Sequence, residues 1–200
     1  MITKTPKVIL ASASKTRSQL LKKAGLKFTV QPADVDEAQI KKISFGIPVK
    51  KIARSLAITK AKQVSGVHTQ ALVIGADQIL DCHGELFDKP IGRDGVRGHL
   101  QKLRGNTHRL ISAACVVEEG KVVWWKTDTA NLTMRDFSDE FIEQFIEIAG
   151  ESAMASVGAY RIEDIGIQLF SRINGDYFTI LGLPLLPLLD FLRNRAVLVS

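Results

Sequence analysis

A junction between an apolar run and a helical pattern near the N-terminus carries side chains that suit phosphate binding. Residues 8–11 (VILA) are apolar, as expected of a buried strand. The next six residues include Ser12, Ser14 and Arg17. The free N–H groups and the dipole of a helix N-terminus attract anions, so two hydroxyls and a guanidinium there can hold a phosphate. The alternative is that the serines only cap the helix and that Arg17 is a surface cation.

Two further charged residues stand in apolar surroundings. At about 100° per residue, Lys60 falls in the middle of the apolar stripe of a helix expected over 49–64. Such a lysine extends its ammonium to solvent, pairs with an acid, or opens into a cleft. Asp77 follows the apolar run 71–75 (ALVIG), at the end of an expected central strand. Ligand sites of open α/β sheets gather at such strand ends, although turn and cap roles remain alternatives.

One more cation, Lys89, and two more carboxylates, Glu37 and Glu163, complete the set of candidate site residues. Lys89 precedes Pro90, which favours an extended backbone, and it is close in sequence to Asp77. Glu37 and Glu163 are further carboxylates, of interest only as members of the set. Metal-assisted attack on a polyphosphate requires acids that hold the ion and orient water, and cations that neutralise the phosphates. These carboxylates and cations together therefore predict metal-assisted attack on a polyphosphate.

The composition is that of an ordinary globular protein, with 46% hydrophobic and 24% charged residues. The net charge of +6 favours anionic ligands, but with 6% aromatic residues the chain lacks the basic stripe with interleaved aromatics typical of RNA binding. Cys82 and Cys115 are far apart and show no metal-ligand spacing, which fits a reducing cytoplasm. The apolar stretch 180–189 is short and broken by Pro184 and Pro187. We therefore expect a cytoplasmic protein with neither a membrane nor a nucleic-acid partner.

The elements that position these residues alternate between strands and helices. Strands are expected at 8–11, 26–30, 71–75, 107–117 and 121–134, with two more about Asn174-Gly175; helices are expected from Thr16 or Ser14 to 24, at 49–64, at 94–103, at 138–150 and after Pro184. Helices alternate with strands early and hairpins dominate later. This order predicts an α/β fold with a mixed twisted sheet, flanking helices and two lobes around a cleft.

The motifs occur in an order that resembles the Maf family of nucleoside triphosphate pyrophosphatases. They are LASASKTRSQLLKKAG, DVDE, LAITKA, GADQIL, GELFDKP, GNTH, VGAYRIEDIG and INGDYFTILGLPL, and they span nearly the whole chain. The resemblance implies one Maf-like domain over 1–200, with a fold similar to that of inosine triphosphate pyrophosphatases. It also implies hydrolysis between the α and β phosphates of a nucleoside triphosphate, a divalent cation (Mg²⁺ or Mn²⁺) in the cleft, and often a homodimer.

The same resemblance implies roles for individual residues. Asp77 takes the proton-acceptor position and Glu37 an acidic metal-site position, with Asp77 as a second metal ligand. The phosphate-binding positions fall on Ser12, Arg17, Lys60 and Lys89, to which the junction described above adds Ser14.

The chain departs from the family pattern at three places that concern the choice of base: Thr16, Gln78 and Glu163. The usual Ser-Pro-Arg-Arg turn reads Ser14-Lys15-Thr16-Arg17. The Asp-Thr and Tyr-Gly-Ile-Gln of the dTTP and UTP pyrophosphatases read Asp77-Gln78 and Tyr160-Arg161-Ile162-Glu163. The last two changes resemble the 7-methyl-GTP pyrophosphatase subgroup, although that subgroup commonly has Trp where Thr16 stands.

These departures favour a modified or non-standard nucleotide of the 7-methyl-GTP kind as substrate. A carboxylate such as that of Glu163 only accepts hydrogen bonds, which suits the adjacent donors of guanine. Two alternatives are a dTTP or UTP pyrophosphatase and a non-catalytic nucleotide-binding regulator of cell division. The intact set of Glu37, Lys60, Asp77 and Lys89 argues against the second.

Overall fold

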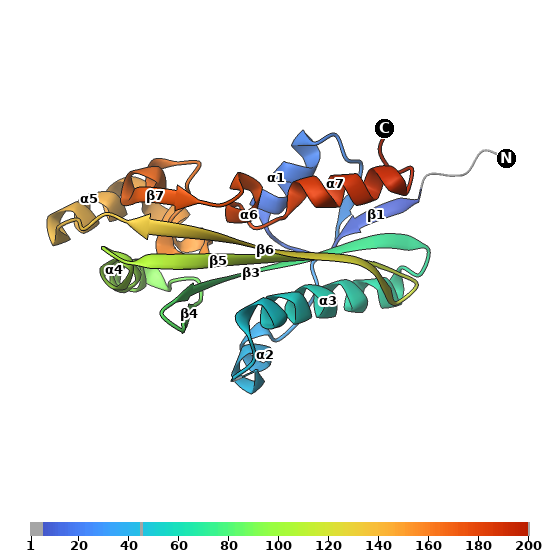
Figure 1. Cartoon of the computed structure of the whole chain (residues 1–200), viewed down its shortest axis with the longest axis horizontal. Coiled ribbons are helices and arrows are strands. Elements are labelled where there is room, and N and C mark those ends of the chain that lie inside the picture. Colours follow the sequence, from blue (N-terminus) through green and yellow to red (C-terminus); the bar gives the residue numbers. More distant parts are fainter. Residues whose placement is uncertain (1–5, 45, 200) are drawn as a thin grey trace. The chain divides into compact units, whose positions relative to one another are not determined.

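The computed structural model describes residues 6–44 and 46–199, and it is an α/β fold built on one mixed sheet (Figure 1). Within these ranges the strands are β1 (Lys7–Leu10), β2 (Thr29–Val30), β3 (Ala71–Cys82), β4 (Glu85–Phe87), β5 (Thr107–Glu118), β6 (Lys121–Met134) and β7 (Phe170–Asn174). They are ordered β2-β1-β3-β5-β6-β7, and β4 pairs with β3. Because β1 is parallel to β2 and β3, whereas β4 and β7 are antiparallel to their partners, the predicted mixed sheet is confirmed.

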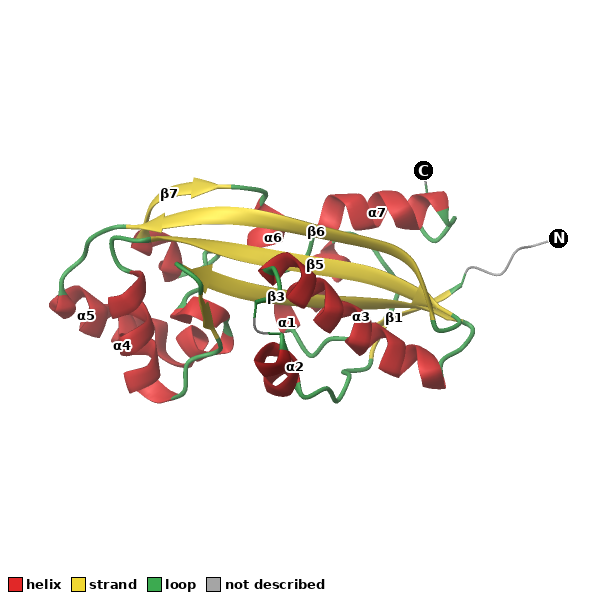
Figure 2. Ribbon diagram, turned by 60° about the horizontal axis from the view of Figure 1, so that its bottom comes forward, coloured by secondary structure: helices red, strands yellow, loops and turns green. Residues whose placement is uncertain are grey.

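Helices flank the sheet, as predicted (Figure 2). In the described ranges they are α1 (Lys15–Lys23), α2 (Glu37–Ile43), α3 (Val49–Val67), α4 (Gly92–Leu103), α5 (Asp139–Ala149), α6 (Tyr177–Ile180) and α7 (Leu185–Asn194). Three short 3₁₀ turns follow α5, namely η1 (Gly150–Ala155), η2 (Val157–Ala159) and η3 (Ile165–Leu169). None of the described helices combines the length and the apolar character needed to cross a membrane.

The chain forms two compact units whose segments alternate along the sequence. The first unit holds Met1–Gln78, Ile111–Asp128 and Asp176–Ser200, and the second holds Ile79–Leu110 and Thr129–Gly175. The boundaries fall inside β3, β5 and β6, so each of these strands contributes residues to both units. The cleft between two lobes stays a prediction.

The first unit packs helices on both faces of its strands. Figure 1 shows α1 and α7 on one face and α3 on the other. On the first face the fully buried side chains include Leu21, Ile74 and Leu188. Removal of this apolar surface from water, at about 25 cal/mol per Å², stabilises the packing of α1 and α7 on this face of the sheet. The opposite face of β3 receives α3 at Gly75, where no side chain separates helix and strand.

The second unit is built around α4 and α5. These helices pack together through buried apolar side chains such as Leu100 and Phe145. The pair is supported at its surface by Arg97, whose Nε and Nη2 donate to the Glu143 carboxylate at 2.5 and 2.9 Å. The 3₁₀ turns then lead the chain into β7.

The structure decides between the two helix starts expected near the N-terminus and shortens the strand that follows. Of Thr16 and Ser14, Ser14 caps α1: its Oγ accepts a hydrogen bond from the Arg17 backbone N–H at 3.3 Å. The strand expected over 26–30 is reduced to Thr29–Val30 at the edge of the sheet. The acidic turn 34–37 leads into α2, since the Asp36 side chain accepts from the Gln39 N–H at 2.9 Å.

The second strand expected after Asn174-Gly175 is absent. Gly175 has φ 146° and ends β7, and Asp176 then caps α6 by accepting from the Thr179 N–H at 2.9 Å. A local side-chain cap thus competes successfully with hairpin formation, which is typical of Asp at a helix N-terminus.

Candidate active site

The Arg17 side chain is buried beneath the start of α1 and is held by three oxygen acceptors. Its Nε donates to the Gly182 carbonyl at 2.8 Å. Its Nη1 donates to Ser12 Oγ at 3.0 Å and to the Ala76 carbonyl at 3.1 Å. Because the acceptors come from β1's end, β3 and the turn after α6, the guanidinium is fixed by segments far apart in the sequence.

Among the described residues no carboxylate forms an ion pair with Arg17. Burial lowers the pKa of Arg17, and the negative charges of Asp77 and Glu37 partly oppose this shift. Arginine nevertheless keeps its proton in proteins. The site therefore contains a buried positive charge whose compensation comes only from a distance, which favours the approach of an anion.

Lys60 lies between two carboxylates of the same unit. Its Nζ is 2.6 Å from Asp77 Oδ1 and 2.8 Å from Glu37 Oε1. Helix α3 presents it on a stripe otherwise made of buried Ala53, Leu56, Ala57, Ala61 and Val64. The side chains of Lys60 and Asp77 are 10% and 5% exposed, whereas that of Glu37 is 46% exposed. Of the three outcomes open to a lysine on an apolar face, pairing with acids is the one observed.

Asp77 carries a free buried oxygen. Burial raises the pKa of Asp77, against the attraction of Lys60 and Arg17 for its charged form. Its Oδ1 accepts from Lys60, but within the described residues its buried Oδ2 has no hydrogen-bond partner. An unpartnered buried acceptor is costly and rare. Oδ2 is therefore available to a proton, a water molecule or a cation.

The donor set of Glu37 and Asp77 fits a hard divalent cation. In residues 6–44 and 46–199 no group of three or more His, Cys, Asp and Glu side chains converges. Mg²⁺, however, is usually held by one or two carboxylates and completed by water and substrate phosphates. Two carboxylates around one ammonium, with Oδ2 unpartnered, meet that requirement.

Gln78 directs its amide away from this cluster and towards the C-terminal segment. Its Nε2 donates to Ser112 Oγ at 3.0 Å and to the carbonyls of Ile180 and Thr179 at 2.9 and 3.2 Å. The Ser112 hydroxyl also donates to the Thr179 carbonyl at 2.7 Å. The amide hydrogens are thereby used to hold the turn whose Gly182 carbonyl binds the guanidinium.

The family profile described as "Maf-like protein" matches residues 7–195. The chain belongs to the Maf family. Three relatives are close to it over almost their full length. A nucleoside triphosphate pyrophosphatase of Paramagnetospirillum magneticum is 50% identical, with 96% of this chain and 100% of the relative covered. One of Nitrobacter winogradskyi is 47% identical (96% and 95% covered), and a 7-methyl-GTP pyrophosphatase of Mesorhizobium japonicum is 48% identical (95% and 96% covered).

Sequence reasoning overlooked two residues that contact this candidate site. Gly182 has φ 94°, and a Cβ on it would lie 3.4 Å from Arg17 Nε and 3.5 Å from Gln78 Oε1. Ser112 is fully buried at the middle of β5. The Maf motif INGDYFTILGLPL contains the signal for Gly182, but nothing local marks Ser112, whose role depends on its neighbours in space.

The predicted site residues fall into two groups. Ser12, Ser14, Arg17, Glu37, Lys60, Asp77 and Gln78 come together in the first unit, and Thr16 is half-buried on α1 beside them in sequence. Lys89 is an exposed residue of the second unit. Glu163 also belongs to the second unit, where it pairs with Arg161. Their participation in one Maf active site stays a prediction.

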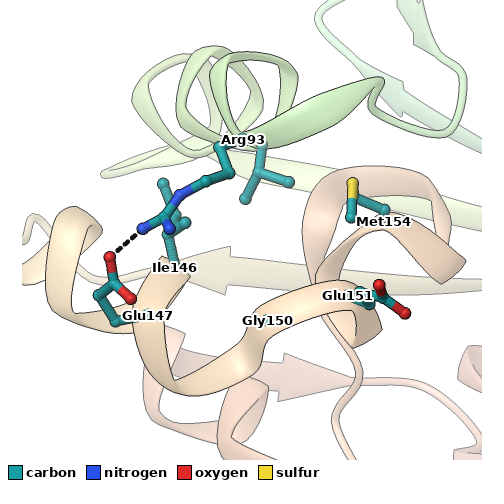
Figure 3. Close-up of a pocket in the computed structure, with 7 residues that line it drawn as sticks. Arg93, Ile146, Glu147, Gly150, Glu151 and Met154 are labelled. Atoms are coloured by element: carbon teal, nitrogen blue, oxygen red, sulfur yellow. Dashed lines mark hydrogen bonds and ion pairs between the residues drawn. The ribbon is translucent and has the colours of Figure 1, made fainter.

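A separate cavity of about 350 Å³ in the second unit contains none of these residues (Figure 3). It is lined by Arg93, Val96, Ile146, Glu147, Gly150, Glu151 and Met154. Two of these lining residues, Arg93 and Glu147, form an ion pair. The cavity lies between α4 and the α5–η1 corner and has no part in the Maf motifs quoted above.

Proposed function

We propose that this chain is a nucleoside triphosphate pyrophosphatase that cleaves between the α and β phosphates and releases a nucleoside monophosphate and pyrophosphate. One observation carries the proposal: buried Lys60 is held by Asp77 and Glu37 in the same unit as the guanidinium of Arg17, which forms no ion pair with any carboxylate in residues 6–44 and 46–199. Acids and cations in this arrangement suit attack on a polyphosphate. The names of the relatives support the same activity.

The cations bind and neutralise the phosphates in this proposal. Arg17 has donors beyond those that its three acceptors use, and its orientation is already fixed. The Nζ of Lys60 can exchange one of its two carboxylate partners for a phosphate oxygen without any movement of α3. The hydroxyls of Ser12 and Ser14 and the ammonium of Lys89 complete the phosphate-binding set. Such fixed donors stabilise the charge that develops on the phosphates in the transition state.

Asp77 takes the proton from the attacking water. Burial raises the pKa of Asp77 towards the pH at which the enzyme works, and a general base is most effective when its pKa is near that pH. Oδ2 is the atom that receives the proton, since Oδ1 is held by Lys60. Lys60 also keeps the carboxylate oriented while the proton moves.

Glu37 and Asp77 would hold a divalent cation, Mg²⁺ or Mn²⁺. When bound, the cation polarises a phosphoryl oxygen and acidifies water. The support from this chain is the pair of carboxylates that meet at Lys60 Nζ, of which that of Glu37 is 46% exposed and therefore accessible to an ion. The orientation of Asp77 does not depend on the cation, because Lys60 contacts the carboxylates of both Asp77 and Glu37.

We infer a substrate of the 7-methyl-GTP kind. Glu163 would accept from the ring N–H and the exocyclic amine of guanine, and a cationic 7-methylguanine would gain a charge-assisted bond. Thr16 and Gln78 are proposed to complete the selection, Gln78 through the turn that it holds. In this proposal the chain acts as one Maf-like domain over 1–200, in the cytoplasm, as a homodimer, and without nucleic acid.

Product analysis tests the activity. Wild-type protein, Asp77→Asn and Glu118→Gln are incubated with 7-methyl-GTP, GTP, dTTP and UTP in Mg²⁺ or Mn²⁺, and pyrophosphate and orthophosphate are measured separately. Wild type should release pyrophosphate, and Asp77→Asn should be slower by about 10² or more. Glu118→Gln is the control, since it removes a carboxylate that Arg195 binds at 2.7 and 2.8 Å outside the Lys60 cluster. Orthophosphate as the first product would refute the proposal, and nucleotide binding without turnover would favour the regulator.

A further inference from the structure

We propose that Arg161 is a positioning residue for base selection: its guanidinium holds Glu163 and reduces the preference of that carboxylate for a cationic base over a neutral one. The inference rests on the proposed function, in which Glu163 meets the base. It concerns a residue of this chain that stands where the dTTP and UTP pattern has glycine.

The backbone on the N-terminal side of Arg161 is anchored by the Tyr160 side chain. Tyr160 is 4% exposed, and its hydroxyl is 2.6 Å from His108 Nε2. Its ring packs edge-on against Phe170 with the centroids 4.8 Å apart. Ser156 Oγ donates to the Tyr160 carbonyl. The residue before Arg161 therefore has a fixed side chain and a fixed backbone.

The chain returns onto Arg161 from the C-terminal side. A Cβ on Gly166 would lie 2.4 Å from the Arg161 carbonyl oxygen and 2.9 Å from its nitrogen, so only glycine allows this approach. Asp164 N–H donates to the same carbonyl at 3.2 Å, and Ile162 is buried. With Tyr160 and Ile162 turned inward, the side chains of Arg161 and Glu163 extend from a rigid turn.

The pair itself leaves Glu163 with one free oxygen. Arg161 donates from Nη2 at 2.9 Å and from Nε at 3.2 Å, both to Glu163 Oε1. No hydrogen bond within the described residues reaches Oε2. The guanidinium also lies 3.4 Å from Asp164 Oδ2 through Nη1. The carboxylate thus has a fixed orientation and a cation beside it.

The orientation of Glu163 and the positive charge of Arg161 act differently on GTP and 7-methyl-GTP, two substrates that share the same hydrogen-bonding edge. Orientation of Glu163 helps GTP and 7-methyl-GTP equally, because both present the ring N–H and the exocyclic amine. The positive charge of Arg161 opposes only the base that is itself cationic. The ratio of kcat/KM for 7-methyl-GTP to that for GTP therefore isolates the charge effect from the orientation effect.

The experiment compares wild type with Arg161→Gln, Arg161→Lys, Glu163→Gln and the double variant Arg161→Gln/Glu163→Gln. Arg161→Gln should raise the ratio about two- to fivefold, the range expected for a partly exposed ion pair. Arg161→Lys keeps the charge and should leave the ratio close to that of wild type. Arg161→Gln should also raise KM for GTP, but not in the Glu163→Gln background, where no carboxylate remains to be oriented.

An unchanged ratio in Arg161→Gln, or an equal rise in Arg161→Lys, would overturn the inference. A purely structural role of Arg161 would lower kcat/KM for all four nucleotides alike and leave the ratio constant, which also overturns it. If wild-type protein releases no pyrophosphate from any nucleotide, the proposed function itself fails, so the two failures are distinguishable.

Discussion

At the scale of single residues, the cluster of Lys60, Asp77 and Glu37 combines binding chemistry with a constraint on stability. Two of the three side chains are almost fully buried. Removal of one partner from a buried ion pair leaves an uncompensated charge, and this costs more than the pair contributes when intact. Lys60 therefore supports the fold through Asp77 as well as the proposed chemistry.

We predict that Lys60→Met lowers the free energy of unfolding by about 3 kcal/mol, the low end for a broken buried pair, because Asp77 can take up a proton. From the helix stripe alone, methionine would be expected to suit this position, and the ion pair reverses that expectation. The measurement is urea unfolding at pH 7. Lys62→Met, at an exposed position of α3, is the control and should change little.

The double variant Lys60→Met/Asp77→Asn sharpens this test. It removes the uncompensated carboxylate together with the lysine, so it should recover part of the lost stability. Full stability of Lys60→Met alone would mean that the ion pair does not constrain the fold.

His108 makes stability depend on pH. It is fully buried, and burial lowers its pKa to about 4 from 6.5. Between pH 6.5 and 4 the unfolded chain binds a proton that the folded protein excludes, so stability is complete above pH 6.5 and is lost as the pH falls towards 4. The loss is on the order of 3 kcal/mol.

We predict that His108→Gln flattens the dependence of the unfolding free energy on pH in this window, since glutamine can still bond to the Tyr160 hydroxyl but does not titrate. Urea unfolding at several pH values from 4 to 7 provides the measurement. His83→Asn, at an exposed histidine, should keep the wild-type slope. Equal slopes for wild type and His108→Gln would assign the acid sensitivity to other groups.

At the scale of elements, the direct contact of α3 with β3 sets the distance from Lys60 to Asp77. A Cβ on Gly75 would lie 2.1 Å from the Ala57 carbonyl oxygen and 2.8 Å from Ala61 Cβ. Both neighbours belong to α3, and one is backbone, so neither can rotate away. The helix that carries Lys60 rests on the strand that carries Asp77 only because Gly75 has no side chain.

We predict that Gly75→Ala displaces α3 and destabilises the protein by about 1–3 kcal/mol, the usual cost of overpacking. Turnover should fall with it, since the displacement moves Lys60 away from Asp77. Gly66→Ala is the control, because Gly66 lies in α3 itself and a Cβ there meets nothing within 4 Å. Alanine in place of glycine favours a helix by about 0.5–1 kcal/mol. Thermal unfolding and pyrophosphate release measure both effects, and wild-type behaviour of Gly75→Ala would show that the contact is loose.

At the scale of the whole molecule, the two units share the strands β3, β5 and β6. Neither unit is a continuous piece of chain in the sense of an independent domain, since the sequence enters the second unit twice. Because the two parts of each shared strand are one continuous stretch of backbone, unfolding of the part in one unit removes the ordered neighbour of the part in the other. The physical expectation is one cooperative transition.

We predict coincident urea unfolding curves for two probes. Both tryptophans lie in the first unit, Trp124 against Phe191 with centroids 5.6 Å apart and Trp125 with the Arg54 guanidinium 4.4 Å from its ring. Their fluorescence therefore reports the first unit, whereas far-UV circular dichroism reports both. Separate midpoints for the two probes would contradict the prediction.

Local patterns in the sequence were sufficient to find most of the candidate site. The 3.6-residue period placed Lys60 on a buried helix face, and the apolar run before Asp77 placed that acid on a central strand. The junction of Ser12, Ser14 and Arg17 was visible for the same reason. Periodicity and capping depend on neighbours within a few residues, so the sequence alone determined these elements and the mixed α/β class.

Only the tertiary structure decided which of these residues meet. The bond from Arg17 to the Gly182 carbonyl joins opposite ends of the chain, and the bonds of Gln78 to Ser112 and Ile180 depend on how β3, β5 and the C-terminal turn are aligned. The local sequence around Asn174-Gly175 suggested a hairpin, yet the Asp176 cap prevailed. Such contacts require closure of long loops and burial of apolar surface contributed by distant segments, and no local pattern contains that information.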